Sequence, residues 1–182
     1  MEVGVLFADM RGYTALAERR SPEEVARFLN RFYAVAARVL ADHDALIDKL
    51  VGDEVMALFL MAFTGPRYME KMVSAAEALL RGVGYGSREG PWLPLGVGVD
   101  FGLAFVGNVG SGEVKDFTAI GDVVNTAARL QGEAKGGQLV ISERVYTAVE
   151  GRYAGASRVE LELKGKSEPV PARVVDLAGV VA

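Results

Sequence analysis

The sequence predicts a single domain of the α/β (α+β) class, with a ferredoxin-like βαββαβ core and additional strands and helices at its C-terminal end. Three observations lead to this prediction. Apolar runs and amphipathic patterns up to residue 105 follow the order strand, helix, strand, strand, helix, strand. No internal repeat, low-complexity tract or linker divides the chain. Its 182 residues are enough to bury one substantial core.

The first elements are a buried strand, a capped helix and a hairpin. Residues 3–9 are mostly apolar, as in a buried strand, and Gly12 follows as a turn residue. The segment 21–24 combines a serine N-cap, a proline at the first helical position and a capping glutamate, so we expect a helix from there to about residue 41. Strands near 45–50 and 55–60 then flank a tight turn at 51–53.

A helix and an unusual strand complete the core. Gly65-Pro66 breaks the chain, apolar side chains at helical spacing predict a helix over about 69–80, and a loop covers 82–94. Residues 95–105 alternate between large apolar side chains and a nearly bare face of Gly, Asp and Ala. Because glycine on a strand permits close approach by another backbone, we expect another element to pack against that face.

The C-terminal part adds an arm, two helices and further strands. In chain order we expect a loop or short arm over 107–116, a strand end over 117–120, a helix from 121–122, a strand over 138–142, a short helix over 143–149 and a strand pair over 157–164 and 169–175. Asn125 and Arg129 are four positions apart on the first of these helices and therefore share a face.

Composition excludes several classes of function. A formal net charge of -4 argues against the broad basic surface that nucleic-acid or anionic-membrane binding requires. The chain has no cysteine for disulfides or thiolate metal sites, and His43, the single histidine, is expected to be a loop residue without a role. No signal peptide or membrane span is visible, so we expect residues 1–182 to be a cytoplasmic domain of a longer protein, whose other segments could carry a membrane anchor.

Two aspartates carry the chemistry that the sequence suggests. Asp9 and Asp53 each adjoin a short apolar strand and a glycine, and they converge at one sheet edge if the two strands are neighbours. Paired carboxylates there would hold hard divalent cations through oxygen ligands. The turn after Asp9 contains Gly12, Tyr13 and Thr14, whose backbone amides could line a phosphate. Taken alone, an aspartate at a strand end is more often a turn or cap residue, so its context decides.

Three linked motifs provide that context. The segments 7–14 (FADMRGYT), 49–59 (KLVGDEVMALF) and 117–130 (FTAIGDVVNTAARL) together resemble the catalytic domain of class III nucleotidyl cyclases. The resemblance runs in order from the first strand to the segment 161–166 (LELKGK) and covers essentially the whole chain.

The resemblance implies a site for two metal ions. Asp9 and Asp53, with the Met10 carbonyl as a further ligand, would bind two Mg²⁺ or Mn²⁺ ions that activate the ribose 3′-hydroxyl and hold the departing pyrophosphate. Asn125 would orient the ribose, and Arg129 would stabilise the charge that builds on the α-phosphate. A solvated polar helix face is the alternative interpretation of the last two residues.

The same resemblance assigns base selection to Lys49 and Thr118. In the family, the position four before the second metal aspartate is lysine in adenylyl cyclases and glutamate in guanylyl cyclases, since lysine donates to the N1 acceptor of adenine. Lys49 therefore favours ATP. Thr118 resembles a bacterial subgroup with threonine or serine at the partner position, although a β-branched strand residue is the plainer interpretation.

Several basic residues are candidates for phosphate binding. The arm commonly supplies an arginine in the family, whereas the segment 111–116 reads SGEVKD, so Lys115 would have to substitute and reduced activity is expected. Lys164 or Lys166 would contact the outer phosphates, and the sequence leaves open which of them does so or whether both are solvated. Arg11 is either a further basic group at the phosphate turn or an exposed turn residue.

The expected function is conversion of ATP into 3′,5′-cyclic AMP and pyrophosphate by a homodimer. In the family, the metal aspartates of one subunit face the base-binding and ribose-binding residues of the other, so a two-fold dimer would hold two active sites and a monomer none. One alternative is a guanylate cyclase. Others are a nucleotide-binding regulatory or dimerisation module with weak or no catalysis, and a plain ferredoxin-like interaction domain.

Overall fold

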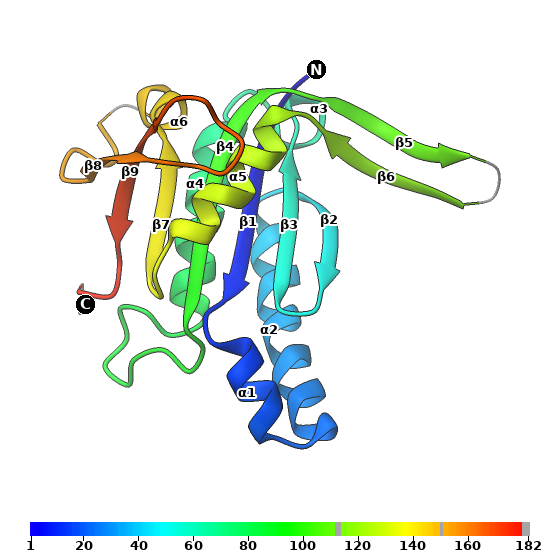
Figure 1. The fold of residues 1–182 in the computed structure, drawn as a ribbon, viewed down its shortest axis with the longest axis vertical. Coiled ribbons are helices and arrows are strands. Elements are labelled where there is room, and N and C mark those ends of the chain that lie inside the picture. The colour runs from blue at the N-terminus through cyan, green and yellow to red at the C-terminus, as the bar shows by residue number, and fades with distance from the viewer. Residues whose placement is uncertain (112–113, 150, 180–182) are drawn as a thin grey trace.

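The computed structural model describes residues 1–111, 114–149 and 151–179. Its centre is a seven-stranded sheet in the order β2-β3-β1-β4-β7-β9-β8, and a separate two-stranded arm, β5-β6, projects from it (Figure 1). The strands are β1 (Glu2–Met10), β2 (Leu46–Val51), β3 (Glu54–Phe59), β4 (Leu95–Leu103), β5 (Phe105–Ser111), β6 (Val114–Ile120), β7 (Gln138–Ser142), β8 (Ser157–Leu161) and β9 (Val170–Asp176). The helices are α1 (Tyr13–Arg19), α2 (Pro22–Asp42), α3 (Met61–Thr64), α4 (Tyr68–Gly82), α5 (Asp122–Glu133) and α6 (Glu143–Ala148).

The fold class predicted from the sequence is confirmed. The neighbouring strands β2-β3-β1-β4 pair antiparallel and are connected in the order of a ferredoxin-like βαββαβ core. β7 joins β4 in parallel, and β9 and β8 extend the sheet by antiparallel pairing. The C-terminal strands therefore enlarge the core sheet rather than form a second domain.

Helices cover both faces of the sheet, because β1 is apolar on both sides (Figure 1). Leu6 and Ala8 belong to the hydrophobic cluster that contains residues of α2 and α4, whereas Val5 and Phe7 belong to the cluster that contains residues of α5. A strand buried on both faces shows a continuous apolar run instead of an alternation. This explains the composition of the first predicted strand.

The bare face of β4 packs against α5 and two arginine side chains, as we expected for some neighbouring element. A Cβ at Gly98 would overlap the backbone nitrogen of Gln131, so glycine permits the close approach of α5. Asp100, fully buried on the same face, forms an ion pair with Arg144 of α6. α5 is thereby fixed against the strand next to β1.

The predicted start of α2 is confirmed, and its end gives His43 a structural contact. Ser21 and Glu24 form the reciprocal capping box, with hydrogen bonds of 3.0 and 3.3 Å. His43 is the C-cap residue of the same helix, and its Nδ1 lies 2.7 Å from the Val39 carbonyl oxygen. His43 therefore lies in the turn after α2, as expected for a loop residue, and its ring contacts the end of that helix.

Two short helices were not expected from the sequence, and the expected arm is a two-stranded ribbon. α1 has no buried residue and α3 spans a single turn, so neither leaves an apolar period in the sequence. The strand expected over 95–105 ends at Leu103, and β5 begins after Ala104 where the chain leaves the sheet. The region 107–116, expected as a loop or short arm, belongs largely to the antiparallel ribbon of β5 and β6.

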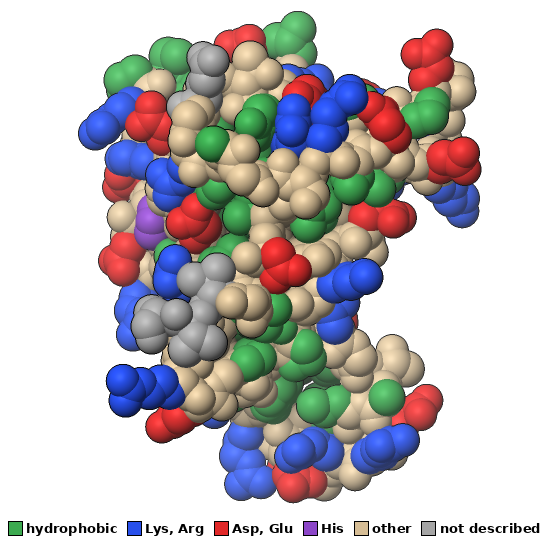
Figure 2. Space-filling view, turned by 90° about the vertical axis from the view of Figure 1, so that its left-hand side faces the viewer, with side chains coloured by type: hydrophobic (Ala, Val, Ile, Leu, Met, Phe, Trp, Pro, Cys, Tyr) green, Lys and Arg blue, Asp and Glu red, His purple; other side chains and the backbone are tan. Residues whose placement is uncertain are grey.

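The surface is consistent with the composition. In the part of the chain that the structure describes, no helix has both the length and the apolar character needed to cross a bilayer. Acidic and basic side chains are interspersed on the face shown in Figure 2. That face carries no broad area of a single charge sign.

Candidate active site

Asp9 and Asp53 come together where β1 ends beside the turn between β2 and β3. β1 and β3 are antiparallel neighbours with Asp9 opposite Glu54, and the Met10 N–H donates to the Asp53 carbonyl at 3.2 Å. Gly52 occupies the turn with a φ of 59°, in the left-handed region that favours glycine. The register of two core strands thus brings the two carboxylates to one place.

The electrostatics of this pair suit a cation. Burial, and then the neighbouring Asp53 carboxylate, raise the pKa of Asp9 from 3.8 to about 7. Asp9 Oδ1 is buried without a hydrogen-bond partner among the described residues. Those residues contain no group of three or more His, Cys, Asp or Glu side chains placed to hold a metal ion. A site with one or two carboxylates is typical of magnesium, which completes its shell with water and substrate phosphates.

Arg11 is held between this pair and α5. Its guanidinium donates to the Gln131 carbonyl and lies 3.6 Å from Asp9 Oδ2. Gly96 provides the space, because a Cβ there would lie 2.5 Å from Arg11 Nη2. The side chain is only 27% exposed, so the interpretation as an exposed turn residue is wrong. Arg11 instead offsets part of the charge of Asp9 and opposes the rise in its pKa.

The turn after β1 leads directly into α1. Gly12 is the N-cap residue with a φ of 76°, and Tyr13 and Thr14 form the first helical turn. Backbone N–H groups in the first turn of an α-helix have no partner within the helix. The neighbouring hairpin tip is tied to α2, because the Tyr33 hydroxyl donates to the Gly52 carbonyl at 2.5 Å.

Lys49 and Thr118 meet between β2 and the arm. Lys49 Nζ lies 3.3 Å from Thr118 Oγ1, 2.7 Å from Asp116 Oδ2 and 2.9 Å from Asp48 Oδ2. The hydrogen bonds to Asp116 and then Asp48 raise the pKa of Lys49 above its ordinary value, so this amine is charged at neutral pH. Sequence reasoning missed both aspartates, although the Asp48-Lys49 dipeptide is a visible charge pair.

Asn125 and Arg129 lie one turn apart on α5. Asn125 is exposed, and Arg129 is half-buried. The guanidinium of Arg129 lies against the connection between β8 and β9, where a Cβ on Gly165 would be 3.2 Å from it. Lys166 in the same connection donates to both carboxylate oxygens of Asp122 at 2.6 Å, which lowers the pKa of Asp122.

The two other candidate phosphate-binding lysines are further from a defined contact. Lys164 is exposed next to Gly165. Lys115 lies opposite Gly110 in the arm, and its side chain is outside the described part of the structure.

Known proteins are similar to this chain over all three motifs. Residues 1–172 match the model of the family described as the adenylate and guanylate cyclase catalytic domain. The chain belongs to this family. The adenylate cyclase of Anabaena cylindrica is 32% identical over an alignment of 176 residues, which covers 91% of the chain and 35% of that protein. This cyclase domain spans about a third of the length of the curated relatives that it matches.

Solved cyclase structures share the fold of this domain. The guanylyl cyclase Cya2 has a TM-score of 0.87 and 28% identity, over 99% of this chain and 93% of that chain. The adenylyl cyclase CyaB from P. aeruginosa has a TM-score of 0.81 and 27% identity, over 100% of this chain and 97% of that chain. The family therefore makes this a nucleotide cyclase domain, a type of lyase, while similar structures include cyclases named for either base.

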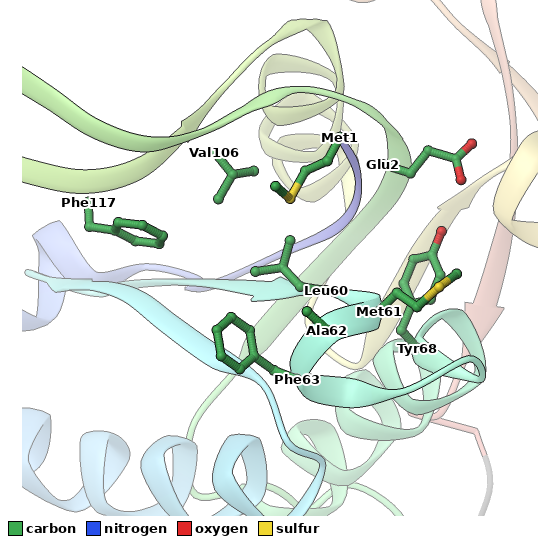
Figure 3. A pocket seen from close by; sticks show the side chains of 9 residues that line it. All are labelled: Met1, Glu2, Leu60, Met61, Ala62, Phe63, Tyr68, Val106 and Phe117. Atoms are coloured by element: carbon green, nitrogen blue, oxygen red, sulfur yellow. The ribbon is translucent and has the colours of Figure 1, made fainter.

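An apolar groove of the cyclase domain was not expected from the sequence. It has a volume of about 760 Å³ and lies between α3, the N-terminus and the arm, with Phe63 and Phe117 on two of its sides (Figure 3). Phe63 is 67% exposed and Phe117 is 47% exposed. The segment 61–63 (MAF), directly before the break at Gly65-Pro66, is the signal that could have indicated it, since consecutive exposed apolar residues are unusual unless functional.

Proposed function

We propose that this cyclase domain is an adenylate cyclase that converts ATP into 3′,5′-cyclic AMP and pyrophosphate. The observation that carries the proposal is the position of Lys49 beside Thr118. A lysine ammonium donates and cannot accept, so it matches the N1 acceptor of adenine and opposes the N1–H group of guanine. The name of the curated relative from Anabaena cylindrica supports the same product.

The aspartate pair is the proposed site of two Mg²⁺ or Mn²⁺ ions. Asp9 and Asp53 would hold them, with the Met10 carbonyl as a further ligand, because the carboxylates are close together and short of compensating charge. When bound, the ions supply activation of the ribose 3′-hydroxyl and neutralise phosphate charge. The pairing of β1 with β3 fixes the carboxylates, and the backbone amides of residues 12–14 would donate to a phosphate oxygen.

The α5 residues would act on the ribose and the α-phosphate. The exposed amide of Asn125 both donates and accepts, which suits orientation of a hydroxyl group. The guanidinium of Arg129 has a planar fork of N–H donors, which suits phosphoryl oxygens as negative charge grows on them. Lys164 or Lys166 remains the proposed contact of the outer phosphates, and Lys115 the proposed substitute for the arm arginine of the family.

A homodimer with shared sites is the proposed assembly. Large apolar side chains around the arm and α3 are between 47% and 75% exposed, and they are Met61, Phe63, Leu103, Phe105, Phe117 and Ile120. A gathering of exposed apolar side chains marks an interaction surface on a soluble domain. A two-fold partner would cover this surface and bring the aspartates of one subunit to the Lys49 and α5 residues of the other.

Complementation tests both the chemistry and the assembly. Asp9→Ala and Arg129→Ala should each be inactive with Mn-ATP, because every composite site then lacks one half. Random pairing after mixing should restore about a quarter of the wild-type sites. A mixture of Asp9→Ala with Asp53→Ala is the matched control and should stay inactive, since both changes affect the same half. Folded, dimeric variants that show no recovery in the first mixture would contradict shared sites.

Guanylate cyclase activity is the second candidate function. The guanylyl cyclase Cya2 is 28% identical to this chain, and the Thr118 hydroxyl discriminates bases less sharply than a carboxylate, because it both donates and accepts. A parallel assay with Mn-GTP distinguishes the two, and a larger output of cyclic GMP would transfer the assignment. ATP binding by the dimer without cyclic nucleotide formation would favour a regulatory or dimerisation module.

A further inference from the structure

β2 carries a bulge at the lysine assigned to base selection. Ile47 pairs with Ala57 and Lys49 pairs with Met56, so the register shifts between them and Asp48 is the extra residue. In a regular strand, Asp48 and Lys49 would point to opposite faces of the sheet. A bulge interrupts that alternation and re-aims a side chain, often beside a functional site.

The bulge brings the buried Asp48 carboxylate to the amine of Lys49, whose side chain is 40% exposed. Asp48 Oδ2 lies 2.9 Å from Lys49 Nζ, and the Asp48 side chain is 0% exposed. Asp48 Oδ1 is buried and has no hydrogen-bond partner among the described residues. Burying a carboxylate costs free energy unless its oxygens are paired or hydrogen-bonded. Within the described part of the chain, only Oδ2 of Asp48 has such a partner, and that partner is Lys49.

The other two partners of Lys49 are an exposed carboxylate and a neutral hydroxyl group. Asp116 Oδ2 lies 2.7 Å from the amine, but the Asp116 side chain is 61% exposed, and water and salt weaken an exposed ion pair. Thr118 is neutral and lies at 3.3 Å. Asp48 is therefore the charged, solvent-excluded partner of an amine on a flexible stem.

We propose that Asp48 is a positioning residue that holds Lys49 in the orientation that reads the purine base. The inference rests on the proposed adenylate cyclase function and adds a residue to it. Lysine has three N–H donors on a flexible four-carbon stem. Asp48 and Thr118 occupy two of them, and the base takes over the third from the exposed Asp116. Fixing the amine before the nucleotide arrives removes part of the ordering cost of binding.

A double-mutant cycle of Asp48→Asn with Lys49→Met tests the proposal. Asparagine keeps the size of Asp48 and removes its charge. The KM for ATP should rise about tenfold while kcat changes less than about twofold, as expected when a charged hydrogen bond acts equally on bound substrate and transition state. In the Lys49→Met background, Asp48→Asn should change KM by less than about twofold, because no amine is left to position.

Inosine triphosphate provides a readout that a merely structural role would not move. Its base presents N1–H and O6 in place of the N1 acceptor and amino group of adenine. The wild type should prefer ATP over inosine triphosphate, and Asp48→Asn should lose most of that preference. Asp44→Asn is the matched control, since it removes an exposed carboxylate that pairs with Lys71 at 2.5 Å, and it should leave the preference unchanged.

The outcomes separate this inference from the proposed function. Two results would overturn the proposal and assign Asp48 to folding alone. One is that the effects of the two substitutions on KM are additive. The other is that Asp48→Asn lowers activity with ATP and with inosine triphosphate equally and also lowers the melting temperature. If the wild type binds ATP without cyclising it, the adenylate cyclase assignment fails, and the same cycle is measured on ATP binding by calorimetry with Mn²⁺. Non-additivity is expected there too. A wild type that binds neither nucleotide overturns both.

Discussion

The two ends of the candidate active site differ in how far nearby groups compensate their charge. At the aspartate end, defined by Asp9 and Asp53, the carboxylates lie together with little compensating charge, and the pKa of Asp9 is raised to about 7. At the base end, defined by Lys49 and Thr118, the amine contacts three acceptors and its pKa is raised. A bound cation would stabilise the aspartate pair, whose negative charge is only partly compensated. The charge of the lysine amine is already compensated, so its function depends on its position. The first end should therefore respond to charge and pH, and the second to the identity of the base.

The two ends also differ in what holds them. Asp9 lies near the end of β1 and Asp53 lies in the turn directly before β3, and these two strands pair with each other inside the sheet. Lys49 lies on β2, the edge strand, and Thr118 lies on the projecting arm (Figure 1). Core pairing fixes the aspartate end, while the base end depends on contacts between side chains. Mutations and changes of pH should therefore affect the two ends differently, and the largest effect is expected at the aspartate end.

Removing a carboxylate from the aspartate end should have the largest effect. We expect Asp53→Ala to lower Mn-ATP turnover by about a thousandfold or more, because cation stabilisation of several kcal/mol is lost at about 1.4 kcal/mol per factor of ten. Asp44→Asn, at an exposed carboxylate, is the control and should keep normal turnover, since asparagine tolerates the left-handed backbone of that position. A cyclic AMP assay measures both variants. Near-normal activity of folded Asp53→Ala would show that this end is not the cation site.

Reversing the charge at the base end should change the choice of nucleotide. We expect Lys49→Glu to lower kcat/KM for ATP about a hundredfold and to raise the relative use of GTP, since a carboxylate accepts from guanine N–H groups. Lys49→Met, which is neutral, should lose ATP preference without gaining GTP. Steady-state kinetics with both nucleotides measure the ratio. An ATP preference that survives in Lys49→Glu would remove Lys49 from base selection.

The aspartate end should respond to pH while the base end does not. Below its raised pKa of about 7, Asp9 is protonated in the cation-free protein, so a cation has to displace that proton. Mn²⁺ affinity should fall by up to about tenfold from pH 7 to pH 6. Lys49 stays charged over this range, so the ratio of ATP to GTP use should stay constant. Calorimetric titration measures the affinity, and equal Mn²⁺ affinity at both pH values would contradict an under-compensated pair.

The smallest expected effect is on stability. The pKa of Asp9 in the folded protein lies above its ordinary 3.8, so the folded protein binds this proton more tightly than the unfolded chain does. The resulting contribution to the free energy of unfolding is present at low pH and is lost as pH rises through about 7. Asp9→Asn should therefore raise the melting temperature in cation-free buffer at pH 8, by about 2–4 °C for each kcal/mol, and less at pH 5. Thermal melting by circular dichroism measures this. A variant that melts below the wild type at pH 8 would argue that Asp9 is compensated by contacts of its own.

Much of the fold and the aspartate end is predictable from local patterns. The continuous apolar run of β1, the capping box of α2 and the glycine face of β4 each act within a few residues or one element. The convergence of Asp9 and Asp53 follows once the strands that they end are taken as neighbours. α1 was missed because it has no buried residue and hence no apolar stripe.

The contacts at the base end could not be predicted from local sequence patterns. Nothing near Asp48 in the sequence marks a bulge, since the bulge exists only in the pairing of β2 with β3. The contact between Lys49 and Asp116 likewise joins an edge strand to the arm across 67 positions. The exposed apolar groove depends on how the arm and α3 lie relative to each other, which no single segment encodes.

The most direct test of a two-ended adenylate cyclase site is the cyclic nucleotide output of the purified domain, measured with Mn-ATP and with Mn-GTP over a range of protein concentrations. We predict cyclic AMP as the main product, with a specific activity that rises with protein concentration as dimers form. Cyclic GMP as the main product, or equal specific activity from monomer and dimer, would contradict it.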